Sequence, residues 1–141
     1  MTSQLNVDTI VDKAGSGGTN IKIGNTATYV SDGGSATQNT VQGLIKVWFY
    51  KEQDGASLGD SFNVSSLTDT GTGDFTVVFA NDFSNSKFGS GSNDVGAHEG
   101  QASSGGVQSV DLQTTFSRFK TYQNGSLTDF IVNGNFAGDL A

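Results

Sequence analysis

Large apolar side chains recur at every second position in the middle of the chain. Phe75, Val77 and Phe79 alternate with Thr76 and Val78, and a period of two is the pattern of a half-buried strand whose apolar side chains share one face. We therefore expect the two Phe side chains and Val77 to face a core. The opposite register would expose both Phe side chains, so Thr76 is expected to face outward or toward a neighbour.

A second strand is predicted at 44–50, where the chain is almost continuously apolar. Such runs are typical of central strands that are covered on both faces, and this is the interpretation we favour. In an extended strand Trp48 and Tyr50 lie on one face and Phe49 on the other. The alternative is that one of these faces contacts another subunit.

Turn-forming residues divide the rest of the chain into short apolar segments. Asn124-Gly125 is a strong hairpin signal, since both central residues of a type I′ turn need positive φ. Roughly seven or eight strands at intervals of about 8–12 residues predict an all-β, antiparallel β-sandwich of jelly-roll-like form. The remaining expected strands are around Phe62, Val64 and Leu67, and at 87–92, 95–99, 107–112, 114–122 and 129–136. The predicted core residues are Phe62, Phe75, Val77 and Phe79.

Residues 1–40 contain too few large apolar side chains to close a core of their own. We expect a short extended N-terminal arm at 1–40, followed by a sandwich head at 41–141. The arm is either flexible or buries its apolar residues against other copies or a partner, and we favour docking or trimerisation. Its expected anchoring residues are Leu5, Val7, Ile10, Val11, Ile21 and Ile23.

Charge and composition narrow the classes of partner. The net charge is −7 and the chain has no Cys; the acidic balance disfavours nucleic acid and anionic membranes. The first twelve residues lack a basic segment followed by an apolar one, so no signal peptide is expected. Apolar runs are too short to span a bilayer.

Two segments contain residues that metals or catalysis use. His98-Glu99 pairs the single His with a carboxylate, but adjacent strand residues point to opposite faces, so a loop His is the expected interpretation. The Asp69–Asp74 segment could offer carboxylates to Ca²⁺, yet it lacks the spacing of an EF-hand loop. We expect no catalytic residue, no metal site and no cofactor.

Two glycine-rich segments match other motifs only in part. Gly89–Asp94 resembles a phosphate-binding loop without the following Lys, and a mobile loop is expected there. Gly55–Gly59 matches the Gly-x-Ser-x-Gly pattern of serine hydrolases. That motif needs a strand before it and a helix after it, whereas a polar turn leading to another strand is predicted here.

Three segments resemble those of bacteriophage tail-fibre proteins. Asp60 to Phe79, DSFNVSSLTDTGTGDFTVVF, is similar to a repeated signature of that family at nearly every position. Phe119–Asp129 is similar to its closing hairpin, and Leu5–Gly15 resembles the opening of marine and cyanobacterial phage fibres. Together the three segments cover a little under a third of the chain.

The resemblance implies a homotrimeric, β-rich structural protein of the virion surface. We therefore expect a non-enzymatic subunit of a tailed phage particle, a short tail fibre or knob, that contacts other virion proteins and serves particle structure or host attachment, with a host surface glycan as a further partner. A capsid decoration protein or a carbohydrate-binding adhesin module are the alternatives. The roughly 30 residues between the N-terminal motif and the head reach about 100 Å at most, which argues against a long fibre.

Overall fold

The computed structural model describes residues 27–30, 37–53, 57–94 and 105–141. The chain divides into two compact units, 1–41 and 42–141. In the first unit, β1 (Thr28–Val30) and β2 (Thr37–Asn39) form an antiparallel pair. Tyr29 on β1 is 62% exposed, so this pair buries little apolar surface by itself.

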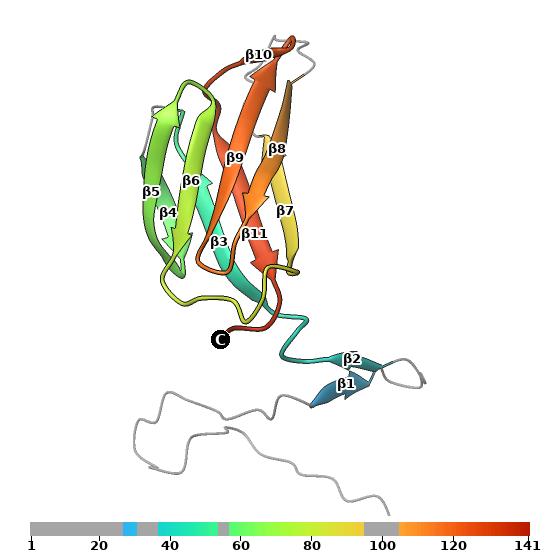
Figure 1. The fold of residues 1–141 in the computed structure, drawn as a ribbon. Coiled ribbons are helices and arrows are strands. Elements are labelled where there is room, and N and C mark those ends of the chain that lie inside the picture. The colour runs from blue at the N-terminus through green and yellow to red at the C-terminus, as the bar shows by residue number, and fades with distance from the viewer. Residues whose placement is uncertain (1–26, 31–36, 54–56, 95–104) are drawn as a thin grey trace, which may run out of the picture. The chain divides into compact units, whose positions relative to one another are not determined.

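The head is an antiparallel β-sandwich, which confirms the predicted fold class (Figure 1). One sheet has the strand order β4-β3-β11-β7. Its strands are β3 (Ile45–Lys51), β4 (Leu58–Phe62), β7 (Gly89–Asp94) and β11 (Val132–Ala137). We call it the β3 sheet.

The second sheet, the β6 sheet, has the order β10-β9-β6-β5, and β8 also pairs with β9. Its strands are β5 (Val64–Gly71), β6 (Asp74–Phe79), β8 (Gly105–Leu112), β9 (Phe116–Gln123) and β10 (Ser126–Leu127). Most neighbouring strands are consecutive in sequence, and β3 and β11, the first and last strands of the head, lie side by side as in a jelly roll.

Phenylalanine rings fill the space between the two sheets. Phe75 and Phe119 stack with centroids 5.3 Å apart, and Phe49 contacts both from the opposite sheet. Burying each such side chain contributes about 1.5–3 kcal/mol. The core residues predicted on β6 lie here. The whole buried apolar set is Val47, Phe49, Phe75, Val77, Phe79, Phe83, Phe88, Phe119, Phe130, Val132 and Phe136.

The prediction that Phe62 belongs to the core is wrong, since its side chain is 55% exposed. The sequence pattern placed Phe62 and Val64 on one strand and therefore on one face. Asn63, with φ 57°, separates them into β4 of one sheet and β5 of the other. The chain changes sheets at this residue, so Val64 packs against the core while Phe62 faces outward.

The prediction that β3 is covered on both faces is also wrong. The strand is central in its sheet, between β4 and β11, and Phe49 on its inner face is fully buried. Trp48 on the outer face remains 38% exposed and Tyr50 is half-buried. The apolar run at 44–50 therefore has one core face and one aromatic surface face.

Two turn predictions have different outcomes. Asn124 and Gly125 both have positive φ, 50° and 80°, and join β9 to β10 as the type I′ signal predicts. Strand β7 (Gly89–Asp94) pairs with β11 along its whole length, which agrees over residues 89–92 with the strand expected at 87–92 and contradicts the loop expected at Gly89–Asp94. Backbone hydrogen bonding at the edge of the sheet overrides the low strand propensity of Gly and Ser there. The strand expected at 95–99 lies outside the described residues.

Candidate functional site

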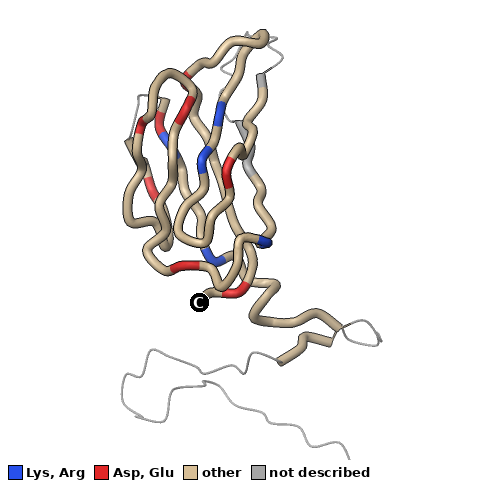
Figure 2. The backbone as a smooth tube through the Cα atoms, in the orientation of Figure 1, with Lys and Arg blue, Asp and Glu red and all other residues tan. Residues whose placement is uncertain are grey.

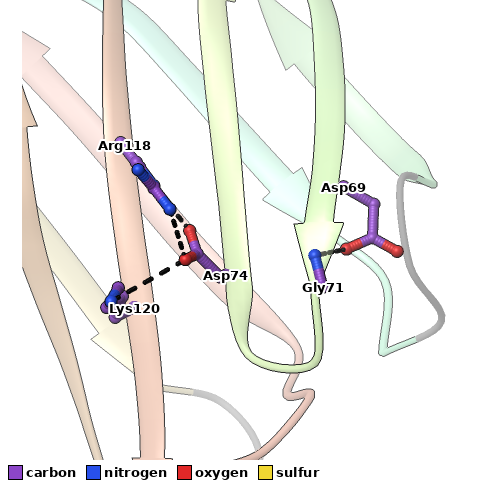
Figure 3. A network of polar contacts seen from close by, with 5 residues as sticks. All are labelled: Asp69, Gly71, Asp74, Arg118 and Lys120. Carbon is purple, nitrogen blue, oxygen red and sulfur yellow. Dashed lines mark hydrogen bonds and ion pairs between the residues drawn. The ribbon is translucent and has the colours of Figure 1, made fainter.

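The turn between β5 and β6 contains the Asp69–Asp74 segment, the possible Ca²⁺ site of the sequence. Asp69 Oδ1 accepts a hydrogen bond from the Gly71 backbone N–H at 2.9 Å, which closes the turn locally (Figure 3). Gly73 has φ 64°, and a Cβ there would lie 2.6 Å from the backbone O of Thr121. The backbone N–H of Gly73 donates to Asp129 Oδ1 at 2.7 Å. Only glycine fits this position, because both the backbone angle and the space exclude a side chain.

Asp74, at the start of β6, points away from Asp69 toward β9. Its two carboxylate oxygens accept hydrogen bonds from Arg118 Nε and Nη2 at 2.7 and 2.6 Å, and Lys120 Nζ lies 3.8 Å away (Figure 3). Figure 2 shows the basic positions of β9 beside acidic positions on the neighbouring strands β6 and β8. The forked geometry matches a guanidinium to a carboxylate and gives the strongest kind of ion pair.

This pairing changes the titration of both groups. The hydrogen bond from Arg118 holds the pKa of Asp74 below its ordinary value, against the opposing effect of burial. The same contact raises the pKa of Arg118. Asp74 is therefore ionised whenever the protein is folded near neutral pH, and its charge is matched on the protein itself.

The two carboxylates considered in the sequence as Ca²⁺ ligands, Asp69 and Asp74, thus accept hydrogen bonds from different groups. Asp69 closes its own turn, whereas Asp74 joins two strands. Across the part of the chain that the structure describes, no three His, Cys, Asp or Glu residues are grouped as a metal site would require. The arrangement at this turn stabilises the hairpin.

Polar residues earlier in the same segment also support the backbone. Asn63 donates through Nδ2 to the Lys46 carbonyl at 3.1 Å, and its Oδ1 accepts from the Asn81 backbone N–H at 2.8 Å. Ser65 lies at an irregularity in the β5–β6 pairing and its Oγ donates to the carbonyls of Val78 and Phe79. The role of Asn63 was not predicted from the sequence, although Asn tolerates positive φ better than most residues and its presence was the available signal.

The other sequence candidates are not brought together. Ser57 of the Gly-x-Ser-x-Gly match is exposed and directly precedes strand β4, where a hydrolase elbow would require a helix. His98 and Glu99 lie outside the described residues. So do all six expected anchoring residues, which are Leu5, Val7, Ile10, Val11, Ile21 and Ile23.

Comparison with family models, with curated proteins and with solved structures finds no match to this chain. Among the described residues, no helix is long and apolar enough to cross a membrane.

Proposed function

We propose that this chain is a non-enzymatic structural subunit of a tailed phage virion, a short tail fibre or knob on the particle surface. The observation that carries the proposal is the segment Asp60–Phe79, which resembles a tail-fibre signature and forms the end of β4, the hairpin β5–β6 and the turns between them. A signature that builds a fold is what a family of structural proteins is expected to share.

Each part of that segment has a structural task in the head. Asn63 switches the chain between sheets, Asp69 and Gly73 shape the turn, and Asp74 is joined to β9. Phe75, Val77 and Phe79 fill the core. The resemblance is therefore explained by packing and backbone geometry.

The division of the chain into two units supports assembly through the arm. Residues 42–141 have a core of their own, whereas the described strands of the first unit leave Tyr29 and Val30 exposed. In our proposal, copies of the arm share their apolar side chains in a homotrimer and dock onto another virion protein. Symmetric copies are the common solution for surfaces that one chain cannot bury.

The test is direct detection in particles. Mass spectrometry of purified virions of the phage that encodes the chain should find its peptides in a copy number that is a multiple of three. Gold-labelled antibody against the head should decorate the tail, and decoration of the capsid would move the protein to the capsid-decoration class. Absence from purified virions would overturn the proposal.

A second experiment locates the anchor. A variant that lacks residues 1–20 should keep the melting temperature of the head and should no longer join particles. Retained incorporation would place the anchor in the head.

A further inference from the structure

The outer face of the β3 sheet has an ordered arrangement of aromatic and polar side chains. The strand register places Trp48 opposite Phe62 on one side and opposite Asn135 on the other. Two residues further along β3, Tyr50 lies between Asp60 and Asn133. Side chains two positions apart share a face, so these six residues form two parallel rows. We call them the aromatic face.

Two glycines on neighbouring strands leave space that side chains of this face occupy. A Cβ at Gly59 would lie 2.7 Å from Tyr50 Cδ1 and 2.6 Å from Glu52 Oε1, so the Tyr50 ring and a carboxylate meet over the bare backbone of Gly59. A Cβ at Gly91 would lie 3.1 Å from Asn135 Oδ1, so the Asn135 amide leans over β7. The amide thus extends away from Trp48, which remains 38% exposed.

We propose that the aromatic face binds a neutral glycan. A sugar ring presents C–H groups on its faces and hydroxyl groups around its edge. The C–H groups suit the negative faces of the Trp48 and Tyr50 rings. The hydroxyl groups can donate hydrogen bonds to amide and carboxylate oxygens. They can also accept hydrogen bonds from amide N–H groups. The register places Asn133 and Asp60 opposite Tyr50, and Asn135 opposite Trp48, so hydroxyl groups around a sugar stacked on the rings would come within reach of these side chains.

The negative charge of the face and of the chain favours neutral over anionic glycans. Asp60 belongs to the face and the Glu52 carboxylate lies beside Tyr50. The net charge of the chain is −7. Anionic sugars would be repelled both locally and at long range, whereas neutral sugars would not.

The size of the face argues against a second copy of the chain as its occupant. Four strands about 4.8 Å apart span about 15 Å, and the face extends about 15–20 Å along β3 even when Ile45 is included. This gives about 300 Å², well below the roughly 800 Å² that each partner buries in a stable protein interface. A protein partner would also desolvate Asp60 and two amides, which is unfavourable unless each finds a matching group.

This inference rests on the proposed function in so far as a virion surface protein meets host glycans. The two can fail separately, because detection in virions does not require sugar binding and sugar binding can be measured on the purified protein. Trp48 is the single Trp of the chain, so intrinsic fluorescence reports on this face alone.

The experiment titrates the full chain with neutral oligosaccharides built from glucose, galactose, mannose or N-acetylglucosamine, and with heparin as the anionic comparison. We expect a saturable change in Trp emission with at least one neutral oligosaccharide and none with heparin. Tyr50→Ala and Asn135→Ala should each weaken binding about fivefold or more. The control Val110→Ala, an exposed position on β8 of the other sheet, should bind as the parent does.

Three results would overturn the inference. The first is no response to any of the neutral oligosaccharides at millimolar concentration. The second is equal binding by the parent, Tyr50→Ala and Asn135→Ala proteins, all with the parent melting temperature. The third is an emission change that depends on protein concentration without sugar, which would assign the face to contact between copies.

Discussion

Arg118 and Asp74 are joined by two parallel hydrogen bonds across neighbouring strands, although they are not direct cross-strand partners. Asp74 lies opposite Lys120, and Arg118 lies opposite Thr76. The pair is therefore diagonal, which suits the long guanidinium side chain and leaves the ammonium of Lys120 3.8 Å from the same carboxylate. One carboxylate at the start of β6 thus attracts two basic side chains of β9.

The first prediction concerns this ion pair and pH. Because the pKa of Asp74 is lowered in the folded protein, its contribution to stability is present above the ordinary Asp pKa of about 3.9 and is lost as pH falls through the lowered value. Asp74→Asn should cost about 1–2 kcal/mol of unfolding free energy at pH 7, a moderate value because Arg118 is 38% exposed.

Urea denaturation from pH 7 to pH 2 measures this effect. The difference between parent and Asp74→Asn should shrink below about pH 4. Asp60→Asn, an exposed carboxylate on the other sheet, is the matched control and should change stability by less than about 0.5 kcal/mol. A difference that stays constant down to pH 2 would contradict the assigned role.

The second prediction concerns a close approach in the core. Gly134 on β11 lies opposite Phe49, and a Cβ there would overlap the Phe49 ring. Gly134→Ala should therefore destabilise the head by about 1–3 kcal/mol. Gly106→Ala is the control, because a Cβ at Gly106 meets nothing within 4 Å. Equal melting temperatures for the two variants would show that the core has room beside Phe49.

The third prediction separates the true core from the expected one. Phe79 is 4% exposed and contacts three other rings, whereas Phe62 is 55% exposed. Phe79→Ala should cost about 3–5 kcal/mol. Phe62→Ala should cost less than about 1 kcal/mol. Chemical denaturation of both variants decides the point, and a loss for Phe62→Ala as large as that for Phe79→Ala would place Phe62 in the core, as the sequence predicted.

The fourth prediction concerns the residue at which the chain changes sheets. Asn63 combines positive φ with three side-chain hydrogen bonds to the backbone of Lys46 and Asn81. Asn63→Gly keeps the backbone angle and loses the bonds, which should cost about 1–2 kcal/mol. Asn63→Ala adds the strain of a left-handed Ala and should cost about 1 kcal/mol more. The reverse order in thermal denaturation would show that backbone strain is unimportant here.

The fifth prediction concerns assembly. Light scattering of the full chain should give the mass of a trimer, and the variant lacking residues 1–40 should give that of a monomer with an unchanged far-ultraviolet spectrum. The physical reason is that the head has its own core, whereas the arm has too few apolar residues for one. A stable monomer of the full chain at micromolar concentration would contradict the proposed assembly.

Much of the fold was predictable because the relevant signals are local. The alternation of Phe75, Val77 and Phe79 determined which face of β6 is buried. Asn124-Gly125 determined a hairpin, since few other residue pairs accept positive φ twice.

The two errors have different physical causes. Gly89–Asp94 has the composition of a loop and becomes a strand because β11 offers a row of backbone hydrogen-bond partners. Phe62 has the composition of a core residue and lies outside because Asn63 redirects the chain. The partner strand of Gly89–Asp94 is distant in sequence, whereas the residue that redirects Phe62 is its direct neighbour, Asn63.

The sequence by itself thus determined the fold class and the inner face of β6, because strand periodicity and turn chemistry act within a few residues. Only the tertiary structure decided which side of β3 is exposed, since that depends on which sheet covers it. It also decided that Asp74 meets Arg118 and that Trp48, Tyr50 and Asn135 share one surface. Those pairs are brought together by the register between strands, and register is a property of the assembled sheet.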